Sequence, residues 1–551
     1  MTSRTVKVAV IGSGLAGLTA AYLLSESGGK DKDVIYEVHL FEKASTLGMD
    51  SSSMSLPVPG EEKDWRIDVP MRSFQGGYYP RLIAFYKHLG VSFRTADYSY
   101  SFARLSPRQD SDGRNITTSI IYNGRSGLAG VSMPSDLRKA SNSSFLLLNV
   151  AKRAWVLFTF AIVAMQLLFC YVRLLILSIP MQRSVDVSAL SFGVWIKRTI
   201  PRGRISGLLG LDTIWIDFAE NILIPLFSAV CTCPTDDVKQ HPVEELLDYI
   251  WLTLGTHHYA ATNGVRDVVA RLSARIPHIH LSSSISGLES DPQDPQLVSI
   301  HCSTVTGDEV YSGFQHIIIA TQASRAIPIL KSYASSLPSS TNGYHAQSVE
   351  DQIACLQHFQ YRPSVVINHT DESLVPDIAA DRRELNLIVA HPSLLAAAKT
   401  EKSDDGWTLN KCSPTYTMAT HSLPIPKGYS SQLPPVFQTT NPIVEPRAER
   451  ILSVARLERA IVTLASKEAL KGLHVEKERG WTSLSGPDEG RLGPLQGAGK
   501  LKNNVDGPGI WLCGSYAYSG IPLLEGCVVS ARHVIEQGIW VCEKTRRKIP
   551  W

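Results

Sequence analysis

The chain opens with a hydrophobic run that stops at a cluster of glycines. Residues 6–11 are apolar and predict a buried β-strand, residues 12–17 read Gly-x-Gly-x-x-Gly, and the Ala- and Leu-rich residues 18–24 predict a helix. A second apolar stretch at 38–41 ends at Glu42. This order of strand, glycine turn, helix, strand and acidic residue is typical of a dinucleotide-binding domain.

Each glycine of the turn has its own task in such a domain. We expect Gly12 to permit the tight turn, Gly14 to let a pyrophosphate approach the backbone, and Gly17 to let the helix pack closely on the strand. The helix start offers free N–H groups and a positive dipole end to the phosphates. The other residues of the turn belong to the same predicted contact: Ser13, Leu15 and Ala16. The alternative is a glycine-rich turn in some other parallel α/β protein.

The acidic residue after the second strand indicates a ribose contact. Glu42 can accept hydrogen bonds from both ribose hydroxyls of an adenosine, and Lys43 follows it directly. We therefore place both residues in the predicted nucleotide site.

A second strand, turn and helix signal lies near the other end of the chain. Residues 509–513 are apolar, Gly514 and Ser515 follow, and residues 528–537 predict a helix rich in Ala, Val and Ile. A plain nicotinamide enzyme would complete its nucleotide domain in roughly the first 150–200 residues. A nucleotide domain built from both ends of the chain therefore favours FAD.

The two ends together resemble the flavin-containing amine oxidase and phytoene desaturase superfamily. Similar internal segments are 66–70 with 76–80, 279–285, 315–321 and 366–371. The resemblance implies an α/β fold: a Rossmann-type FAD-binding domain interleaved with a mixed α+β substrate domain that carries a helical, partly apolar insertion. The implied FAD-binding parts are 1–90, 256–330 and 476–551, and the implied substrate parts are 91–255 and 331–475.

The resemblance also implies how FAD is held. The N-terminal turn would bind the ADP half, with Ile285 on the strand whose backbone meets the adenine. The C-terminal turn and helix would bind the ribityl-flavin half through Gly514, Ser515, Leu524 and Glu525. No Ser-Gly-Gly-Cys motif precedes that turn, so the implied flavin is non-covalent.

The sequence departs from the family in two places. Residues 48–51 read Gly-Met-Asp-Ser where the family has Gly-Gly-Arg, so the arginine that would face the pyrophosphate is missing. The serines at 51–53 could donate hydrogen bonds instead. Ser515 stands where the family has an acid, and Glu525 is a candidate to replace that acid.

A long apolar run interrupts the middle of the chain. Residues 154–172 contain only two polar side chains, Thr159 and Gln166, and the apolar character resumes as far as residue 177. The run is just long enough to cross a bilayer. A full crossing would place the two ends of the chain, which must meet on one cofactor, on opposite sides of a membrane. We therefore expect segment 154–177 to dip into or lie along a membrane surface; a re-entrant hairpin and a buried helix are the alternatives.

The composition of this chain of 551 residues limits the classes of partner and cofactor that we expect. A net charge of +3 gives no electrostatic case for nucleic acid, and 44% apolar residues exclude a mostly disordered chain. The nine cysteines include no CxxC pair, so we expect neither a disulfide scaffold nor a metal site. We expect an intracellular, membrane-associated protein.

Candidate catalytic residues are few, because a flavin itself carries the redox chemistry. His257 and His258 could act as acid or base, with a structural loop role as the alternative. His369 could form an oriented pair with Asp371, or simply a hydrogen bond at a strand end. The remaining candidates could line the substrate cavity or pack in the core: Tyr416, Tyr516 and Tyr518.

These patterns predict an FAD-dependent oxidoreductase that moves a hydride between flavin and a small apolar substrate, such as a lipid, an isoprenoid or a secondary metabolite. The alternatives are a flavin-dependent isomerase on the same fold and a non-catalytic FAD-binding, membrane-associated protein. The sequence leaves the electron acceptor open. It also predicts one further helix, over residues 452–473, from the spacing of its leucines and isoleucines.

Overall fold

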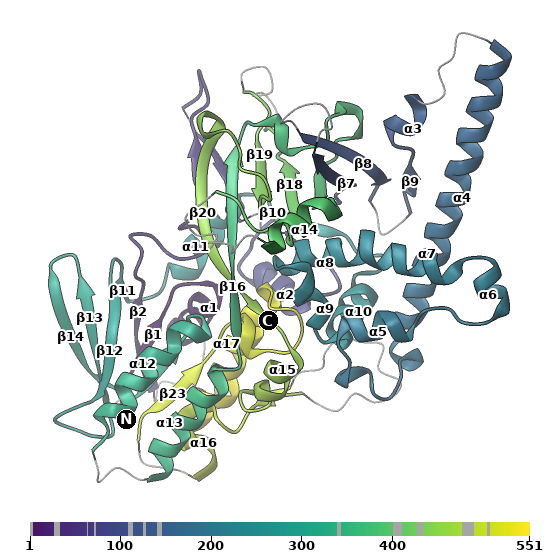
Figure 1. The fold of residues 1–551 in the computed structure, drawn as a ribbon. Coiled ribbons are helices and arrows are strands. Elements are labelled where there is room, and N and C mark those ends of the chain that lie inside the picture. Colours follow the sequence, from purple (N-terminus) through teal and green to yellow (C-terminus); the bar gives the residue numbers. More distant parts are fainter. Residues whose placement is uncertain are drawn as a thin grey trace.

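The structure is a computed structural model. It describes residues 4–26, 34–62, 64–70, 73–107, 114–124, 128–139, 146–338, 343–400, 410–426, 433–476, 490–503 and 507–551. Two large sheets organise the molecule, one beside the N-terminus and one above it in Figure 1, and a group of helices lies to their right.

The first large sheet has five parallel strands. Its strands are β1 (Arg4–Ile11), β2 (Val34–Phe41), β11 (His278–His280), β15 (His316–Ile319) and β23 (Gly509–Leu512). Their spatial order is β11-β2-β1-β15-β23, which is 3-2-1-4-5 when these strands are counted along the chain. This is the order of a doubly wound Rossmann-type sheet, in which ligands bind at the carboxyl ends of the strands where the order reverses. Here the reversal lies between β1 and β15.

The sequence of β1 explains why this sheet is covered on both faces. Val6, Val8 and Val10 belong to one hydrophobic cluster, whereas Ala9 and Ile11 belong to another. Because successive side chains of a strand point to opposite faces, a strand buried on both sides reads as a continuous apolar run. The helices that cover the two faces are α1 (Leu15–Ser25) and α17 (Leu524–His533) on one, and α12 (Ala323–Ser336) and α13 (Gly343–Leu356) on the other.

Two glycines of the first turn perform the predicted backbone tasks. Gly12 has a φ of +99°, a conformation that L side chains rarely adopt. A Cβ atom on Gly17 would lie 1.9 Å from the carbonyl oxygen of Gly12, so only glycine allows the helix to pack this closely on the strand. The predicted strand, turn and helix are therefore confirmed.

The second large sheet has eight strands in the order β20-β16-β19-β18-β17-β7-β8-β9. Its neighbours pair antiparallel except β17 and β7, which are parallel. The strands are β7 (Tyr100–Pro107), β8 (Arg114–Tyr122), β9 (Val131–Ser132), β16 (Gln360–His369), β17 (Leu385–Ala390), β18 (Met418–Ser422), β19 (Phe437–Thr440) and β20 (Ile451–Ile461). The α/β fold class is thus confirmed, with a second domain interleaved into the Rossmann-type domain.

The segment boundaries proposed from the sequence differ from the packing at one point. The expected boundary at residue 330 falls inside α12, and α13 also packs on the five-stranded sheet, where Val349, Ile353 and Leu356 share a cluster with Ile317 and Ile510. Residues 331–356 thus pack on the five-stranded sheet, although the expected division placed them in the substrate part, and the expected boundaries themselves stay a prediction.

The helix predicted over 452–473 is wrong. Residues 451–461 form β20, which pairs antiparallel with the whole of β16, and only α15 (Leu464–Leu470) is helical. The leucine and isoleucine spacing fits a helix face, but this segment instead forms an edge strand whose inner side pairs with the extended strand β16. Pairing with β16 has overridden the local pattern.

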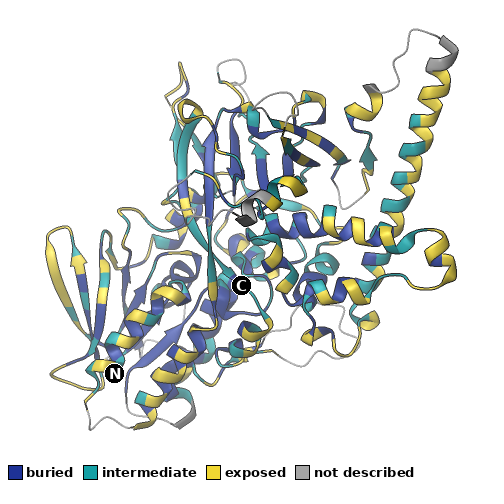
Figure 2. Ribbon diagram, viewed as in Figure 1, coloured by how far each residue is buried: buried dark blue, intermediate teal, exposed yellow. Residues whose placement is uncertain are grey.

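A helical region projects on the side away from the N-terminus. It consists of α4 (Leu146–Ser178), α5 (Phe192–Arg198), α6 (Arg204–Leu208), α7 (Leu211–Phe218), α8 (Ile224–Cys231), α9 (Thr235–Gln240) and α10 (Val243–Thr253). The base of α4 is buried in this region through Cys170, Leu174 and Ser178. Most of the rest of α4 is exposed, as Figure 2 shows.

Among the residues that the structure describes, two helical stretches are long and apolar enough to cross a membrane by length and composition. They are 150–178 and 211–231, and 11% and 44% of their most apolar windows are buried. The alternative of a buried helix at 154–177 is therefore wrong. The second stretch was not predicted.

Smaller elements complete the described chain. The strands are β5 (Ser73–Gln75), β10 (His258–Ala261) and β6 (Phe93–Thr95) in one sheet, β12 (Ser284–Ser290), β13 (Val298–Thr304) and β14 (Gly307–Phe314) in another, and the pairs β3 (Met54–Leu56) with β4 (Trp65–Ile67) and β21 (His474–Val475) with β22 (Arg491–Leu492). The helices are α2 (Pro80–His88), α3 (Ser135–Lys139), α11 (Gly264–Ser273), α14 (Pro392–Thr400), α16 (Lys500–Asn503) and α18 (Trp540–Cys542).

Candidate functional site

The glycine turn leaves open space at the start of α1. Gly14 caps this helix, and no described atom lies within 4 Å of the position that its Cβ would take. The packing therefore does not require glycine at residue 14, in contrast to residue 17. A ligand lying against the backbone at this point would require it, which fits a phosphate at the helix start.

Glu42 lies beside this turn and is buried. Its Oε2 accepts hydrogen bonds from the N–H of Ser13 at 3.0 Å and from the Ser13 hydroxyl at 2.6 Å, and its Oε1 accepts one from the N–H of Ala44 at 2.9 Å. An ionised carboxylate has about four acceptor positions. One position thus remains for a ribose hydroxyl, and the predicted ribose contact stays a prediction.

The segment that we expect at the adenine, residues 279–285, lies next to Glu42. Glu42 donates its N–H to the carbonyl of His280, and Ser283 donates its N–H to the carbonyl of Glu42, both at 2.8 Å. Ile285 follows on β12, half-buried, and the Lys43 side chain is exposed. The predicted neighbourhood of Glu42 is therefore assembled, although no contact of Ile285 or Lys43 with a nucleotide is tested.

Arginines reach the neighbourhood of the turn from positions that the motif did not indicate. The segment after Gly48 touches Ser13, whose hydroxyl accepts the Gly48 N–H at 2.8 Å. Asp50 in this segment pairs with Arg66 at 2.7 Å and with Arg266 at 3.1 Å. Arg66 and Arg266 are thus held through Asp50, two residues after the glycine that contacts Ser13, although residues 48–51 lack the family's arginine.

The C-terminal turn faces the space between the two large sheets. Gly514 donates its N–H to the Ser530 hydroxyl at 3.0 Å, which fastens the turn to α17. Ser515 and Leu524 line a cavity of about 270 Å³, which we call cavity 1. Other walls of cavity 1 come from the eight-stranded sheet, including Leu385, Ala419 and Thr440.

Glu525 has a structural partner. Its two carboxylate oxygens accept the backbone N–H groups of Arg81 and Leu82, both at 2.9 Å, at the start of α2. Burial raises the pKa of Glu525 to about 7, although these two hydrogen bonds oppose the shift. The carboxylate therefore caps α2 and ties it to α17, and its predicted contact with the ribityl chain remains untested.

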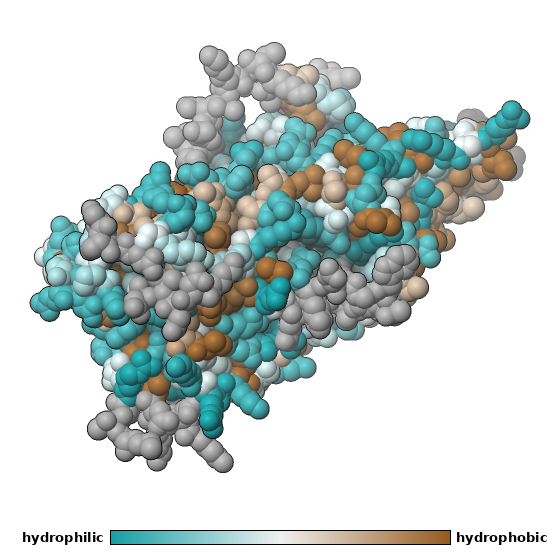
Figure 3. All heavy atoms as spheres, turned by 90° about the horizontal axis from the view of Figure 1, so that it is seen from below, coloured by the Kyte–Doolittle hydropathy of each residue, from teal (hydrophilic) through white to brown (hydrophobic). Residues whose placement is uncertain are grey.

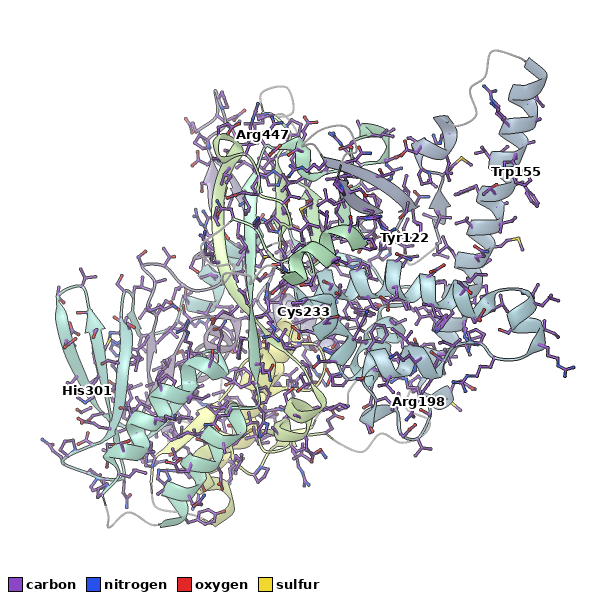
Figure 4. The ribbon with its side chains drawn as sticks, in the orientation of Figure 1. Tyr122, Trp155, Arg198, Cys233, His301 and Arg447 are labelled. Atoms are coloured by element: carbon purple, nitrogen blue, oxygen red, sulfur yellow. The ribbon has the colours of Figure 1, made fainter. Side chains whose placement is uncertain are left out.

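A second cavity adjoins the first. Cavity 2 has a volume of about 370 Å³ and lies between α4, the helices α7, α8 and α10, and the β7–β8 side of the large sheet, where Figure 4 labels Tyr122. Its walls include Phe102, Leu167 and Leu174. Both cavities share the side chains Gln75, Tyr98, Tyr100, Leu226, Val230, Tyr249 and His258. The two cavities are therefore adjacent, and we call these seven side chains the shared wall.

Polar atoms without a partner point to a ligand at this wall. Gln75 donates through Nε2 to His258 Nε2 at 2.6 Å, but Gln75 Oε1 is buried without a hydrogen-bond partner among the described residues. His421 Nδ1, in cavity 1, is in the same situation within the described chain. Buried polar atoms are normally paired, so these two atoms fit hydrogen bonds to a bound molecule.

The consecutive histidines His257 and His258 lie in different surroundings. His257 Nδ1 lies 2.6 Å from Asp97 Oδ2 on a partly exposed surface, whereas His258 lines both cavities. The other oxygen of Asp97 accepts the backbone N–H of His258. Burial lowers the pKa of His258 to about 4, so it is a neutral hydrogen-bonding group at pH 7.

His369 and Tyr416 do not line either cavity. His369 is fully buried, its Nε2 lies 2.7 Å from the Thr439 hydroxyl, and its Nδ1 accepts the backbone N–H of Asp371. The Asp371 carboxylate instead accepts N–H groups of other residues. Tyr416 is a core residue that donates its hydroxyl to the carbonyl of Pro363. The structure corrects both interpretations, because hydrogen bonds within the second domain already use these groups.

The aromatic pair after the C-terminal turn is also packed. Tyr516 lies in the core against Phe359, and the Tyr518 ring packs on His474. Neither lines cavity 1 or cavity 2. Ser515 and Leu524 supply the wall of cavity 1 in this region instead.

Sequence reasoning identified His258 and Ser515 but missed three other polar residues that line the cavities. Gln75, Tyr98 and His421 belong to three segments, and the ring of Tyr98 lies 5.7 Å from His258 and 5.8 Å from His421. Gln75 directly precedes the Gly76-Gly77 pair of a segment that the resemblance singled out, which is the one available signal.

Comparison with known proteins supports the nucleotide-binding domain. Residues 10–89 match the family model described as an NAD(P)-binding Rossmann-like domain. No curated protein matches the chain. Together with the 3-2-1-4-5 sheet, the match defines a protein with a Rossmann-type dinucleotide-binding domain.

Several solved structures are similar over nearly their whole length. An oxidoreductase from Methanosarcina mazei has 13% identity and a TM-score of 0.48, with 96% of this chain and 100% of that chain covered. Cyclohexylamine oxidase from Brevibacterium oxydans IH-35A has 11% identity and a TM-score of 0.47, with 98% of this chain and 100% of that chain covered. Putrescine oxidase bound to putrescine has 12% identity and a TM-score of 0.44, with 97% of this chain and 99% of that chain covered.

The buried histidines predict acid-sensitive folding. Burial lowers the pKa of His421 from 6.5 to about 4, so the unfolded chain takes up this proton at a higher pH than the native protein. The stabilisation is complete above pH 6.5 and is lost as pH falls toward 4. His421→Phe should reduce the loss of unfolding free energy between pH 7.5 and pH 4.5 by about 2–3 kcal/mol, measured by urea titration at each pH.

An exposed position provides the control for this prediction. Val310→Phe, on β14 at a residue that is 56% exposed, introduces the same ring and removes no titratable group, so it should leave the pH dependence unchanged. Identical curves for His421→Phe and the unchanged protein would contradict the assignment of His421 as a buried neutral imidazole.

Proposed function

We propose that the protein is an FAD-dependent oxidoreductase that acts on a small apolar substrate delivered from a membrane surface. The observation that carries the proposal is the arrangement around the carboxyl edge of the five-stranded sheet. The N-terminal turn, Glu42 and the C-terminal turn all lie at this edge, and the C-terminal turn opens into cavity 1. A long dinucleotide that is bound at one turn and reaches the other suits this arrangement better than a mononucleotide.

The residues present fit such a cofactor. The open Cβ position of Gly14 leaves room for a pyrophosphate, and Glu42 keeps one free acceptor position beside it. Arg66 and Arg266 add positive charge near the turn. Bound FAD would supply hydride transfer. The chain's own task is then to hold the cofactor, exclude water from cavity 1 and orient the substrate.

The neutral imidazole of His258 and the amide of Gln75 would provide that orientation. Both lie in the wall shared by the cavities, and Gln75 Oε1 lacks a hydrogen-bond partner among described residues. Cavity 2 supports the apolar substrate class, because most of its lining consists of Leu, Ile, Val, Phe and Tyr side chains. An apolar molecule in cavity 2 would extend a reactive end through the shared wall toward Ser515.

Two surface features support the membrane contact. On α4, Trp155 is 69% exposed, and Figure 4 shows it on the part of the helix that stands away from the body. On and beside α6, Leu208 and Leu209 are 87% and 60% exposed, next to Arg202 and Arg204. Figure 3 shows apolar side chains on this side of the molecule, mixed with hydrophilic ones. Apolar residues flanked by cations are typical of helices that lie in a membrane interface.

Contacts on either side of α4 argue against a full crossing. The Asp381 carboxylate accepts the backbone N–H and the hydroxyl of Ser135, which precedes α4, although Asp381 itself lies far beyond the helix in the chain. Residues on both sides of α4 are therefore packed together in one body. We infer that α4 lies along the membrane or dips into it.

The cofactor assignment predicts a yellow protein whose flavin depends on residue 14. Gly14→Val should place a side chain in the pyrophosphate space and lose at least nine-tenths of the bound flavin, measured from the visible spectrum and by mass spectrometry of the extracted cofactor. Gly343→Val, which also has an open Cβ position but starts α13, should keep its flavin. A colourless parent protein that stays colourless with added FAD would contradict the proposal.

The reaction type predicts bleaching of the flavin by substrate. Under anaerobic conditions, a panel of lipids and isoprenoids should contain a compound that reduces the flavin, which separates an oxidoreductase from a net non-redox isomerase. Leu226→Trp, in the shared wall, should slow this reduction at least tenfold without releasing flavin. Val310→Trp, on the exposed face of β14, is the matched control. Turnover without any net reduction would favour the isomerase.

The membrane contact predicts that charges on α4 release the protein from vesicles. Leu157→Asp with Phe158→Asp changes two exposed residues that line neither cavity, and should lower the bound fraction at least fivefold in vesicle sedimentation. Val305→Asp with Val310→Asp adds the same charge to exposed apolar positions on the distant β13–β14 hairpin and should have no effect. Equal binding by both variants would refute a specific contact through α4.

A further inference from the structure

We propose that Glu37, His39 and His278 form a binding site for a divalent transition-metal ion of the zinc type. One ligand atom from each of these side chains lies within 4.8 Å of the others. His39 Nε2 and Glu37 Oε1 are already 3.0 Å apart, and the rings of His39 and His278 stack with centroids 4.3 Å apart. The site lies at the open edge of the five-stranded sheet and is separate from both cavities.

Strand geometry explains why these side chains meet. Glu37 and His39 are two residues apart on β2 and so point to the same face. β11 pairs parallel with β2 in the register that sets His278 opposite His39. The expectation of no metal site was based on spacing within short stretches of sequence. It could not include a ligand set whose members belong to strands far apart in the chain.

The donor set suits zinc better than magnesium or calcium. Two imidazole nitrogens and one carboxylate oxygen are ligands that Zn²⁺ prefers, whereas the harder ions prefer oxygen alone. Zinc bonds of about 2.0–2.2 Å to such ligands place the ligand atoms about 3.3–3.5 Å apart in a tetrahedron. Because the rings of His39 and His278 are stacked at 22°, the exposed His278 ring must turn and the partly exposed Glu37 side chain must rotate to aim their ligand atoms at one ion, while water can take the fourth position.

His280 supports the buried member of the set. His280 Nε2 lies 3.0 Å from His39 Nδ1, so His39 can donate its Nδ1 proton to His280 and present an unprotonated Nε2 to the ion. A hydrogen bond of this kind commonly fixes the ring of a metal-bound histidine. Without metal, the same contacts would be a stacked pair of imidazoles with a Glu37–His39 hydrogen bond.

An occupied site would fasten β11 to β2 next to the nucleotide pocket. The carbonyl of His280, at the end of β11, accepts the N–H of Glu42. The ion would hold an edge strand that otherwise has one neighbour in this sheet. We therefore assign it a stabilising role close to the predicted adenosine site.

The test is a calorimetric titration of the tag-free, EDTA-treated full-length protein with zinc chloride. The expected result is one zinc ion per chain, with affinity reduced at least tenfold in His278→Ala and in Glu37→Gln. His301→Ala, which removes an exposed histidine 2.8 Å from Glu289, should bind zinc like the parent protein. Absence of binding, or equal affinity in His278→Ala, would overturn the proposal.

A cobalt titration separates a lost ligand from a misfolded variant. Co²⁺ bound to the parent protein should give a visible absorption band that His278→Ala lacks, while the melting temperatures of the two metal-free proteins agree. A cobalt band that persists in His278→Ala would place the ion elsewhere and overturn the site. Neither measurement depends on flavin or substrate, so its result is independent of the proposed function.

Discussion

The parallel pairing of β1, β15 and β23 is the constraint on which the rest of the structure depends. These strands come from the beginning, the middle and the end of the chain, and their ladders join Ile11 to Ile319 and Ile319 to Leu512. The carboxyl ends of parallel strands lie at one edge of a sheet, so both glycine turns are brought to the same edge. The contact between Gly17 and the Gly12 carbonyl then sets how closely α1 lies on β1.

Signals that depend on consecutive residues were predictable from the sequence. The strand, turn and helix of residues 4–25 and the position of Glu42 follow from a local pattern, because a phosphate-binding turn is built from the backbone of adjacent residues. The segment 451–461 shows the opposite case. Its partner β16 lies about ninety residues earlier, and nothing within the segment reveals that pairing.

Only part of the candidate site was predictable, because its residues come from segments that lie far apart in the chain. His258 was identified, but its neighbours Gln75, Tyr98 and His421 lie together only after two sheets have formed. Glu525 was chosen for its acidity near the late turn, whereas the folded chain uses both of its oxygens for α2. His369 and Tyr416 were chosen for their chemistry, and their buried hydrogen bonds within the second domain could not be read from residue type.

Helix α4 takes part both in the proposed membrane contact and in the wall of the proposed substrate cavity. Moving one Leu, Phe or Val side chain from water to an apolar phase is favourable by about 1.5–3 kcal/mol, so the large apolar residues on the outer surface of α4 strongly favour an apolar partner. The base of the helix is held firmly, since Arg173 donates to the carbonyl of Thr199 and packs over Trp215. A helix fixed in this way holds its inner residues Leu167 and Leu174 against cavity 2. In the proposed function, the same helix therefore contacts the membrane on one side and encloses the substrate on the other, which joins the two requirements in a single element.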